Sequence, residues 1–270
     1  MTIDYALPAP LTMFDDDQLT AVDALPSDPV ALCRAAQGLV VDINVVPGLP
    51  EGRYDEREIR PARELLARVL ARNSATLDRP RANDDRVGGT CRHFAVLSVA
   101  LLRAHGIAAR ARCGFASYFS PGLFVDHWVA EYHDGERWIR VDTEILGLPF
   151  VADPGDLQVG EFLTGGEAWI ECREGQADPQ HFGVTGVEHA WGIGEVRGNA
   201  IRDLAALNKV EMLPWDEWGR MEASYRGEAG PDFDDLVEAV ARTTIADDPA
   251  SLSSLYETDE LVVPTDLVAT

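Results

Sequence analysis

The chain has 270 residues, of which 46% are hydrophobic, so it is long enough to bury a substantial core. Its 46 acidic residues outnumber its 23 lysines and arginines, and the net charge of −23 opposes binding to nucleic acid or to anionic membrane surfaces. The longest apolar runs are much shorter than a membrane span, and the first residues lack the basic start and apolar middle of a secretion signal. We therefore expect a cytoplasmic protein that binds neither nucleic acid nor membrane.

The cysteines do not suggest a disulfide framework or a metal site. They lie at wide and unequal intervals, and neither a C-x-x-C nor an H-E-x-x-H pattern occurs. Cys91 and His93 are two residues apart on a predicted helix, so their side chains point in different directions. We expect no metal and no other cofactor. The four cysteines are Cys33, Cys91, Cys113 and Cys172.

The first part of the chain is predicted to be helical. In "DPVALCRAAQG" a short helix is framed by Ser27, Pro29 and Gly38, and Cys33 is expected to be a small buried side chain. A longer packing helix is predicted from Asp55 to Asn73, because its apolar residues recur on one stripe. A polar loop then leads to the sequence "VGGTC".

A buried helix is predicted from Cys91 to His105, because apolar residues surround most of its circumference and Gly106 ends it. A cysteine at the first turn lies at the positive end of the helix dipole, which is expected to lower the pKa of its thiol and raise its reactivity. Cys91 is thus a candidate nucleophile, with its backbone N–H as a candidate oxyanion donor. Asn83 and Thr90 are candidate second donors, and Thr90 is also expected to cap the helix.

A strand in "IAARARCGF" and a hairpin in "HWVAEYHDGERWIRVDTE" follow this helix. Asp134 and Gly135 are predicted to form a two-residue turn, and this register places His127 directly opposite Asp142. A carboxylate at that distance can orient an imidazole. An offset of more than one residue, or a position on opposite faces, would overturn the assignment of His127 and Asp142 to one catalytic triad. Asp126 points to the other face and is expected to be a solvated charge.

After the hairpin the sequence predicts one strand and further helices. "EAWIECREG" is interpreted as a strand that carries Cys172, and a helix is predicted to include residues 196–207. Another helix is predicted near "PDFDDLVEAVARTT", and the acidic end that follows is expected to be loosely held or to cover a neighbouring subunit. The segment that leads into the 196–207 helix is a possible cap of the active site. Its candidate substrate contacts are His189, Trp191, Arg197 and Asn199.

Residues 86–147 combine these features in a specific order. A Gly-rich loop precedes a cysteine that opens a buried helix, "LLRAHGIAARARCGF" leads from helix to strand, and "DHWVAEY" and "WIRVDTE" lie on successive strands. This arrangement resembles the transglutaminase-like core of the papain-like cysteine enzymes. The resemblance implies that Cys91 is the nucleophile, His127 the base and Asp142 the acid that orients the base.

Two other functions remain open. Arylamine N-acetyltransferases share the order Cys, His, Asp, but they would be expected to continue with glycine and phenylalanine where this chain has "VDTEILG". The scarcity of lysine also disfavours a pocket for the pyrophosphate of acetyl-coenzyme A. A non-catalytic binding protein that retains the fold is the third possibility, although it would not need all three residues of the triad.

The predicted fold class is α+β, with a central helix that carries the cysteine packed on an antiparallel sheet and helical segments on either side. The predicted function is cysteine-dependent acyl transfer from an amide or thioester of a peptide, protein or small molecule, either to water or to an amine. The sequence leaves the oligomeric state open. The predicted boundaries are an N-terminal helical segment at 1–85, the catalytic core at 86–175, a C-terminal helical segment at 176–245 and an acidic tail at 246–270.

Overall fold

The computed structural model describes residues 3–268, and their contacts form two compact units. The Cys91 unit comprises residues 4–111 and 129–157, and the His127 unit comprises residue 3, residues 112–128 and the described residues from 158 onward. Both units are built from segments that are not contiguous in sequence. The predicted core at 86–175 is therefore divided between them, because strands β3 (Ala109–Ala116) and β4 (Phe124–His133) each run from one unit into the other.

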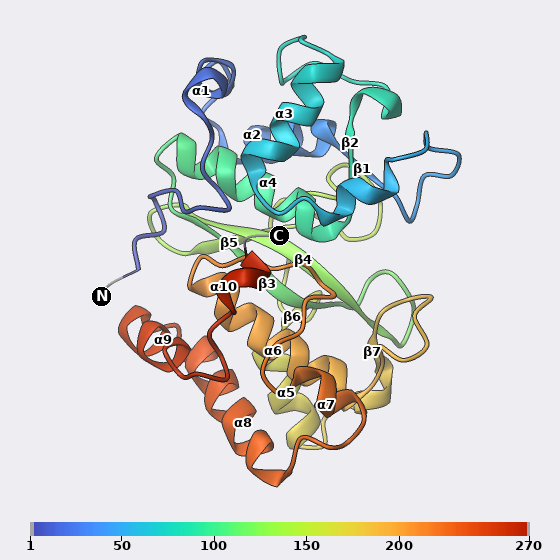
Figure 1. Ribbon diagram of the computed structural model, residues 1–270, viewed down its shortest axis with the longest axis vertical. Helices are drawn as coiled ribbons and strands as arrows, with labels where there is room; N and C mark the ends of the chain where they lie inside the picture. The colour runs from blue at the N-terminus through green and yellow to red at the C-terminus, as the bar shows by residue number, and fades with distance from the viewer. Residues whose placement is uncertain (1–2, 269–270) are drawn as a thin grey trace. The chain divides into compact units, whose positions relative to one another are not determined.

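Helices predominate over strands in the Cys91 unit, and α4 packs against α1, α2 and α3 (Figure 1). The carboxylate of Asp28 caps α2 by accepting the N–H of Ala31 at 2.8 Å, and Pro29 occupies the first turn. The unit contains α1 (Asp16–Asp23), α2 (Pro29–Leu39), α3 (Ala62–Arg72), α4 (Cys91–Ala104) and the 3-10 turns η1 (Tyr54–Glu58) and η2 (Asn83–Asp85).

The helix predicted from Asp55 to Asn73 is divided into two elements. Pro61 separates η1 from α3 and is itself the N-cap of α3, in an extended conformation. A proline has no N–H for an internal helical hydrogen bond, and it disfavours helical geometry in the residue before it. The prediction of one continuous helix is therefore wrong at its beginning.

The strands form a small parallel pair and a larger, mainly antiparallel sheet, which makes the fold α+β. Strand β1 (Val40–Asp42) pairs in parallel with β2 (Val87–Gly89), just before the helix that carries Cys91. In the larger sheet the strand order is β5-β4-β3-β6, and β7 pairs in parallel with β4. The remaining bounds are β5 (Trp138–Val141), β6 (Phe162–Thr164) and β7 (Phe182–Gly183).

The turn between β4 and β5 lies one residue later than predicted. His133 pairs with Trp138 rather than with Glu136. Gly135 adopts a φ of +106°, and the carboxylate of Asp134 accepts the backbone N–H groups of Glu136 and Arg137 at 2.7 and 2.8 Å. Both features stabilise a turn centred after Asp134, because glycine tolerates positive φ and aspartate readily accepts N–H groups further along the chain.

This turn changes the partner of Asp142. Ala130 pairs with Val141, and continuing the register by one residue sets Asp142 opposite Val129. The prediction that His127 lies directly opposite Asp142 is therefore wrong by two residues, which exceeds the one-residue limit set above. Direct cross-strand opposition no longer supports the pair. Because the register is shifted by an even number of residues, each side chain stays on the face of the hairpin that was predicted for it.

The two faces of the hairpin agree with this alternation. Ala130, Ile139 and Val141 are buried on the predicted core face. On the other face, Glu131 lies opposite Arg140 and accepts a hydrogen bond from its Nε at 2.9 Å. Only the observed register sets these opposite charges directly across from each other, so the sequence contained a signal for this register in Glu131 and Arg140.

In the His127 unit, α5 packs against both α6 and α8 (Figure 1). The segment "EAWIECREG" belongs to α5 and is not the predicted strand. A capping box begins this helix: Thr164 Oγ1 accepts the N–H of Glu167 at 3.2 Å, and a Glu167 carboxylate oxygen accepts the N–H of Thr164 at 2.7 Å. The helices are α5 (Gly165–Arg173), α6 (Ile193–Leu207), α7 (Met221–Tyr225), α8 (Pro231–Ala246), α9 (Pro249–Tyr256) and α10 (Thr265–Val268), with a 3-10 turn η3 (Pro179–His181).

The acidic end of the chain is held by specific contacts as far as it is described. Leu252 on α9 and Leu261 are fully buried, and Trp218 donates its indole N–H to the carbonyl of Leu261 at 3.0 Å. Glu260 forms an ion pair with Arg220 at 2.5 Å. The expectation of a loosely held tail is therefore wrong for residues 249–263. Within residues 3–268, no helix is long and apolar enough to cross a membrane.

Candidate active site

Cys91 is the first residue of α4, as predicted, and its side chain is partly exposed. The next twelve residues of the helix are all buried. Thr90 precedes the cysteine as N-cap in an extended conformation, which confirms its predicted capping role. The thiol therefore lies at the accessible N-terminal end of a helix whose middle is buried, where backbone N–H groups are directed toward it.

The two glycines before Thr90 allow close backbone packing. We define residues 88–91 as the nucleophile loop. A Cβ atom on Gly88 would lie 2.3 Å from the carbonyl oxygen of Arg53, and one on Gly89 would lie 2.7 Å from the Cβ of His93. Neither contact is possible for a residue with a side chain. The sequence "GGTC" thus reflects steric limits around the loop as well as chemistry at the cysteine.

Hydrogen bonds fix the backbone of this loop from two sides. The N–H of Gly88 donates to Glu56 Oε2 at 2.8 Å, and Glu56 is itself ion-paired with Arg72. The carbonyl of Gly89 accepts the N–H of Ile43 at 3.1 Å. Two elements distant in sequence, η1 and the end of β1, therefore set the path of the chain into Cys91.

Thr90 is not available as an oxyanion donor in this geometry. Its N–H donates to His93 Nδ1 at 3.0 Å, and its hydroxyl lies 3.2 Å from the same nitrogen. The alternative candidate, Asn83, lies in the exposed turn η2. The contact with His93 thus disfavours the Thr90 N–H as an oxyanion donor, whereas the roles of Asn83 and of the Cys91 backbone N–H stay predictions.

Asp142 lies in the same unit as Cys91 and is completely buried. Its Oδ1 accepts the N–H of Glu144 at 3.0 Å, and its own N–H donates to the carbonyl of Pro154 at 2.9 Å. The following residue, Thr143, is hydrogen-bonded through its hydroxyl to Ser98 of α4 at 2.8 Å. The segment that carries Asp142 is thus joined to the helix that carries the cysteine.

His127 lies in the other unit and is 2% exposed. Its ring makes edge-on contacts with Phe119 and Tyr118, with centroid distances of 5.0 and 6.3 Å. Both aromatic residues come from the loop between β3 and β4, so they restrict the orientation of the imidazole. The sequence analysis did not identify them. Their position in "SYFSPG", just before the strand of His127, was the available signal.

Asp126 is not the solvated charge that was predicted. Its carboxylate accepts the side-chain N–H of Asn199 at 2.7 Å. Burial raises the pKa of Asp126 to about 7, and the neighbouring Glu195 carboxylate acts in the same direction. The strand therefore carries a half-buried acid with a raised pKa directly before the predicted base, on the opposite face of the strand.

Asp126 is part of a larger set of buried polar contacts, which we name the α6 network: Asp126, Glu195, Asn199, Arg202 and Tyr225. Arg202 donates to Glu195 at 3.1 Å and to Asn199 at 3.0 Å, and the Tyr225 hydroxyl donates to Glu195 at 2.6 Å. Three of its members, at positions 195, 199 and 202, lie on one face of α6 because of their helical spacing.

The predicted substrate contacts lie in the same unit as His127 but in different environments. Asn199 is 0% exposed, and both its amide groups are engaged: Nδ2 donates to Gly114 and Asp126, and Oδ1 accepts from Arg202. The amide therefore has no remaining group for a substrate. The guanidinium of Arg197 is also engaged within the protein, since it donates to Asp234 through Nε at 3.0 Å and to Ser224 at 3.2 Å.

The other two predicted contacts have more accessible surface. Trp191 is partly buried over Gly183, and its indole N–H donates to the carbonyl of Val184 at 2.9 Å. His189 is exposed. Their contact with a substrate stays a prediction.

The other three cysteines are poor nucleophiles. Burial raises the pKa of the Cys33 thiol to about 11 and that of Cys172 to about 12. Burial also raises the pKa of Cys113, which lies against the α6 network. These thiols remain protonated near neutral pH, and only the thiolate is the reactive form.

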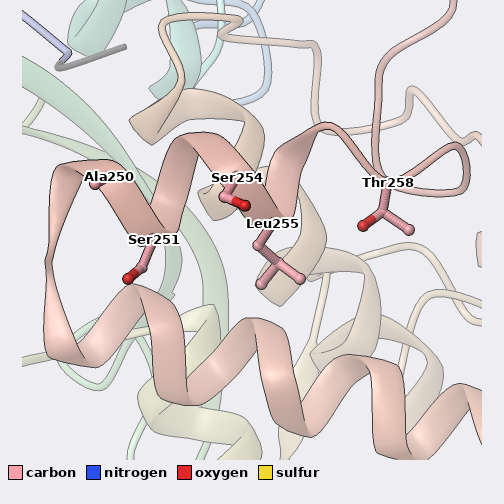
Figure 2. Close-up of a pocket in the computed structure, with 5 residues that line it drawn as sticks. All are labelled: Ala250, Ser251, Ser254, Leu255 and Thr258. Atoms are coloured by element: carbon pink, nitrogen blue, oxygen red, sulfur yellow. The ribbon is translucent and has the colours of Figure 1, made fainter.

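No alternative site is evident in the part of the chain that the structure describes. Within residues 3–268, no group of three or more His, Cys, Asp or Glu side chains could hold a metal ion. An open hollow lies along α9 and the turn after it, lined by Ala250, Ser251, Ser254, Leu255 and Thr258 (Figure 2). Its lining has no histidine, cysteine or carboxylate, so it has no groups suited to acid-base or thiol chemistry.

Comparison with known proteins supports the resemblance inferred from the sequence. Residues 70–143 match the transglutaminase-like superfamily, and this range contains Cys91, His127 and Asp142. No curated protein matches the chain. A crystal structure from Cytophaga hutchinsonii, provisionally named a cysteine protease, is 18% identical with a TM-score of 0.35, over 59% of this chain and 44% of that chain. The match thus spans less than half of that protein's length.

Proposed function

We propose that this chain, whose residues 70–143 match the transglutaminase-like superfamily, is a cysteine-dependent acyl-transfer enzyme with Cys91 as nucleophile. The observation that carries the proposal is the accessible thiol at the start of the buried helix α4, within the matched region. His127 is the proposed base and Asp142 its orienting acid. The proposed compartment is the cytoplasm, where a free nucleophilic thiol is kept reduced.

The proposed reaction has two steps. In the first, the Cys91 thiol gives its proton to His127 while its sulfur attacks the carbonyl carbon of an amide or thioester. The bond to the leaving nitrogen or sulfur breaks, and that atom receives the proton from the imidazolium. The product is a thioester between the acyl group and Cys91.

In the second step, water or an amine attacks the thioester carbonyl and gives a proton to His127. The Cys91 sulfur leaves and is protonated again, which restores the enzyme. Water as acceptor makes the enzyme a hydrolase, and an amine makes it a transferase. The backbone N–H of Cys91 is the proposed donor to the oxyanion in both steps.

The support for the three residues is unequal. The role of Cys91 is supported by its position at the start of α4, by its partial exposure and by its place in the matched region. His127 has the family match and a ring orientation restricted by Phe119 and Tyr118. Asp142 has its place in the matched region and its burial, but the observed register removes the argument from direct opposition to His127.

The test is the pH dependence of alkylation by iodoacetamide, followed by mass spectrometry of each cysteine. Because the other three thiols stay protonated, we expect one rapidly labelled site, Cys91, in the unmodified protein. The variant His127→Ala should slow its labelling at pH 7 by at least about tenfold, since the thiolate would lose its ion pair. A Cys91 thiol that titrates near 8.5 in both proteins would overturn the proposal.

A second measurement separates the possible reactions. The protein is mixed with a panel of peptide amides and activated thioesters, and intact-mass spectrometry is used to look for an acyl group on Cys91. Acylation that decays in water indicates a hydrolase, and decay accelerated by added amines indicates a transferase. Acylation only from acetyl-coenzyme A would favour the acetyltransferase alternative. A reactive thiol that no acyl donor modifies would favour a binding protein.

A further inference from the structure

His93 lies two residues after the proposed nucleophile and takes no part in the reaction proposed above. Its side chain is 0% exposed. Nδ1 accepts the N–H of Thr90 at 3.0 Å, and Nε2 lies 3.2 Å from the carbonyl oxygen of Ile59. A backbone N–H can only donate and a carbonyl can only accept, so Nδ1 carries no proton and Nε2 carries one. The contacts therefore define a single neutral tautomer.

We propose that His93 is a positioning residue, which acts as a fixed neutral imidazole and holds the nucleophile loop so that Cys91 is presented for attack. The inference rests on the proposed function, because it requires Cys91 to be the nucleophile. His93 touches no reacting group in this proposal. It acts through Thr90, the residue directly before the cysteine.

The imidazole does more here than the usual capping residue. A capping box ordinarily has glutamate or glutamine at the third helical position, where it accepts the N–H of the N-cap residue. His93 makes that contact with Thr90 and also reaches Ile59, which lies between η1 and α3. One side chain thus joins the nucleophile loop to the segment before α3.

The loop is shaped to fit this ring. Gly89 lies so close that a Cβ atom there would be 2.7 Å from Cβ and 2.8 Å from Cγ of His93. Burial lowers the pKa of His93 to about 3, and the neighbouring Arg92 guanidinium lowers it in the same direction. The ring therefore stays neutral at the pH at which an ordinary histidine gains a proton, and it remains able to accept the Thr90 N–H.

The same contacts argue against His93 as the base, although it is the histidine closest to Cys91 in sequence. A general base needs a free nitrogen lone pair directed at the thiol. The lone pair of Nδ1 is directed at Thr90, and Nε2 carries its proton toward Ile59. His93 and His127 are thus expected to affect the thiol differently.

The experiment compares three variants by the pH profile of Cys91 alkylation with iodoacetamide, in parallel with their thermal unfolding. His93→Phe retains a buried ring but removes both hydrogen bonds. His93→Gln restores the ordinary capping box and cannot titrate. His105→Phe is the matched control, because His105 ends the same helix and its Nε2 makes one contact, with the carbonyl of Val22 at 3.1 Å.

We expect His93→Phe to slow alkylation at pH 7 about tenfold and to shift the profile to higher pH, because the N–H groups at the helix start lose their fixed orientation. The alkylation rate of His93→Gln should stay within about threefold of that of the unmodified protein, and it should fall over the same pH range as the pH is lowered. The control His105→Phe should leave the profile unchanged. A merely structural His93 would change the unfolding temperature without moving the thiol profile.

Two results would overturn the inference: a folded His93→Phe variant with the unmodified profile, or a His93→Gln variant as slow as His93→Phe. If His93→Phe does not fold, His93→Met replaces it, because methionine adapts to irregular space and also makes neither hydrogen bond. The variant His127→Ala separates this inference from the proposed function. If alkylation of Cys91 is slower in His127→Ala but not in the His93 variants, the inference about His93 is wrong and the proposed function stands. If His127→Ala has the same alkylation profile as the unmodified protein, the proposed function itself is contradicted.

Discussion

The nucleophile loop and the α6 network both bury polar groups, but they satisfy them in different ways. The loop relies mainly on backbone groups and on the neutral ring of His93, with one ionic contact at its start, where the Gly88 N–H donates to the Glu56 carboxylate. The α6 network relies on charge, with Arg202 hydrogen-bonded to Glu195 and Asn199, and with the acid Asp126 close by. A neutral imidazole needs little compensation when buried, whereas an ion is costly to bury unless its partners remain in place.

The difference shows why one region was visible in the sequence and the other was not. Thr90 and His93 are three residues apart, and the glycines adjoin them, so a short motif contains most of the arrangement. Asp126 and Asn199 are 73 residues apart. No local pattern links them, and the two were assigned separate roles, a solvated charge and a substrate contact. Charge networks of this kind emerge only when distant segments pack together.

The largest effect is expected from breaking the α6 network at its cation. Arg202→Met should lower the free energy of unfolding by about 3–5 kcal/mol, because it leaves the buried Glu195 carboxylate without its charged partner. Urea denaturation measures the change. Arg242→Met is the control, since Arg242 is 69% exposed in its ion pair with Glu238 and should contribute no more than about 0.5 kcal/mol. Equal effects of the two variants would contradict the role assigned to burial.

A smaller loss of stability is expected from a substitution in the nucleophile loop. Gly89→Ala should lower the free energy of unfolding by about 1–3 kcal/mol, because the added Cβ would overlap the side chain of His93. The matched substitution Gly38→Ala adds a Cβ in open space within α2 and should stabilise the protein by about 0.5–1 kcal/mol. Thermal and urea unfolding of both variants test the prediction. If Gly89→Ala stabilises the protein, the loop can accommodate a Cβ atom at this position and the steric argument is wrong.

The last prediction concerns the pH dependence of stability at Asp126. Its pKa in the folded protein, about 7, lies above the ordinary value of 3.8. Between these values the folded protein holds a proton that the unfolded chain has lost, so this group's contribution to stability falls as the pH rises through the window. Asp126→Asn should remove that decline, as measured by urea unfolding from pH 4 to 8. Glu51→Gln, at an exposed position, is the control. If the unfolding free energies of Asp126→Asn and of the unmodified protein change with pH in parallel, the raised pKa of Asp126 is refuted.

Local signals explain which elements the sequence predicted well. The apolar pattern and Gly106 defined α4 to within one residue, and the alternation from Ile107 onward indicated β3. The same reasoning failed at α5, where the capping box Thr164–Glu167 was the decisive signal and was overlooked in favour of an apparent strand. It also failed in the tail, whose burial of Leu252 and Leu261 is a property of the packed structure.

The candidate site shows the same division. The sequence by itself determined that Cys91 opens a buried helix after a glycine-rich approach, because these features are encoded in neighbouring residues. Only the tertiary structure decided the hairpin register at Asp142, the neutral state of His93 and the half-buried environment of Asp126 against Asn199. Each of these depends on a competition between turn geometry, hydrogen-bond partners and desolvation, and these energies are set by contacts between segments that are distant in the chain.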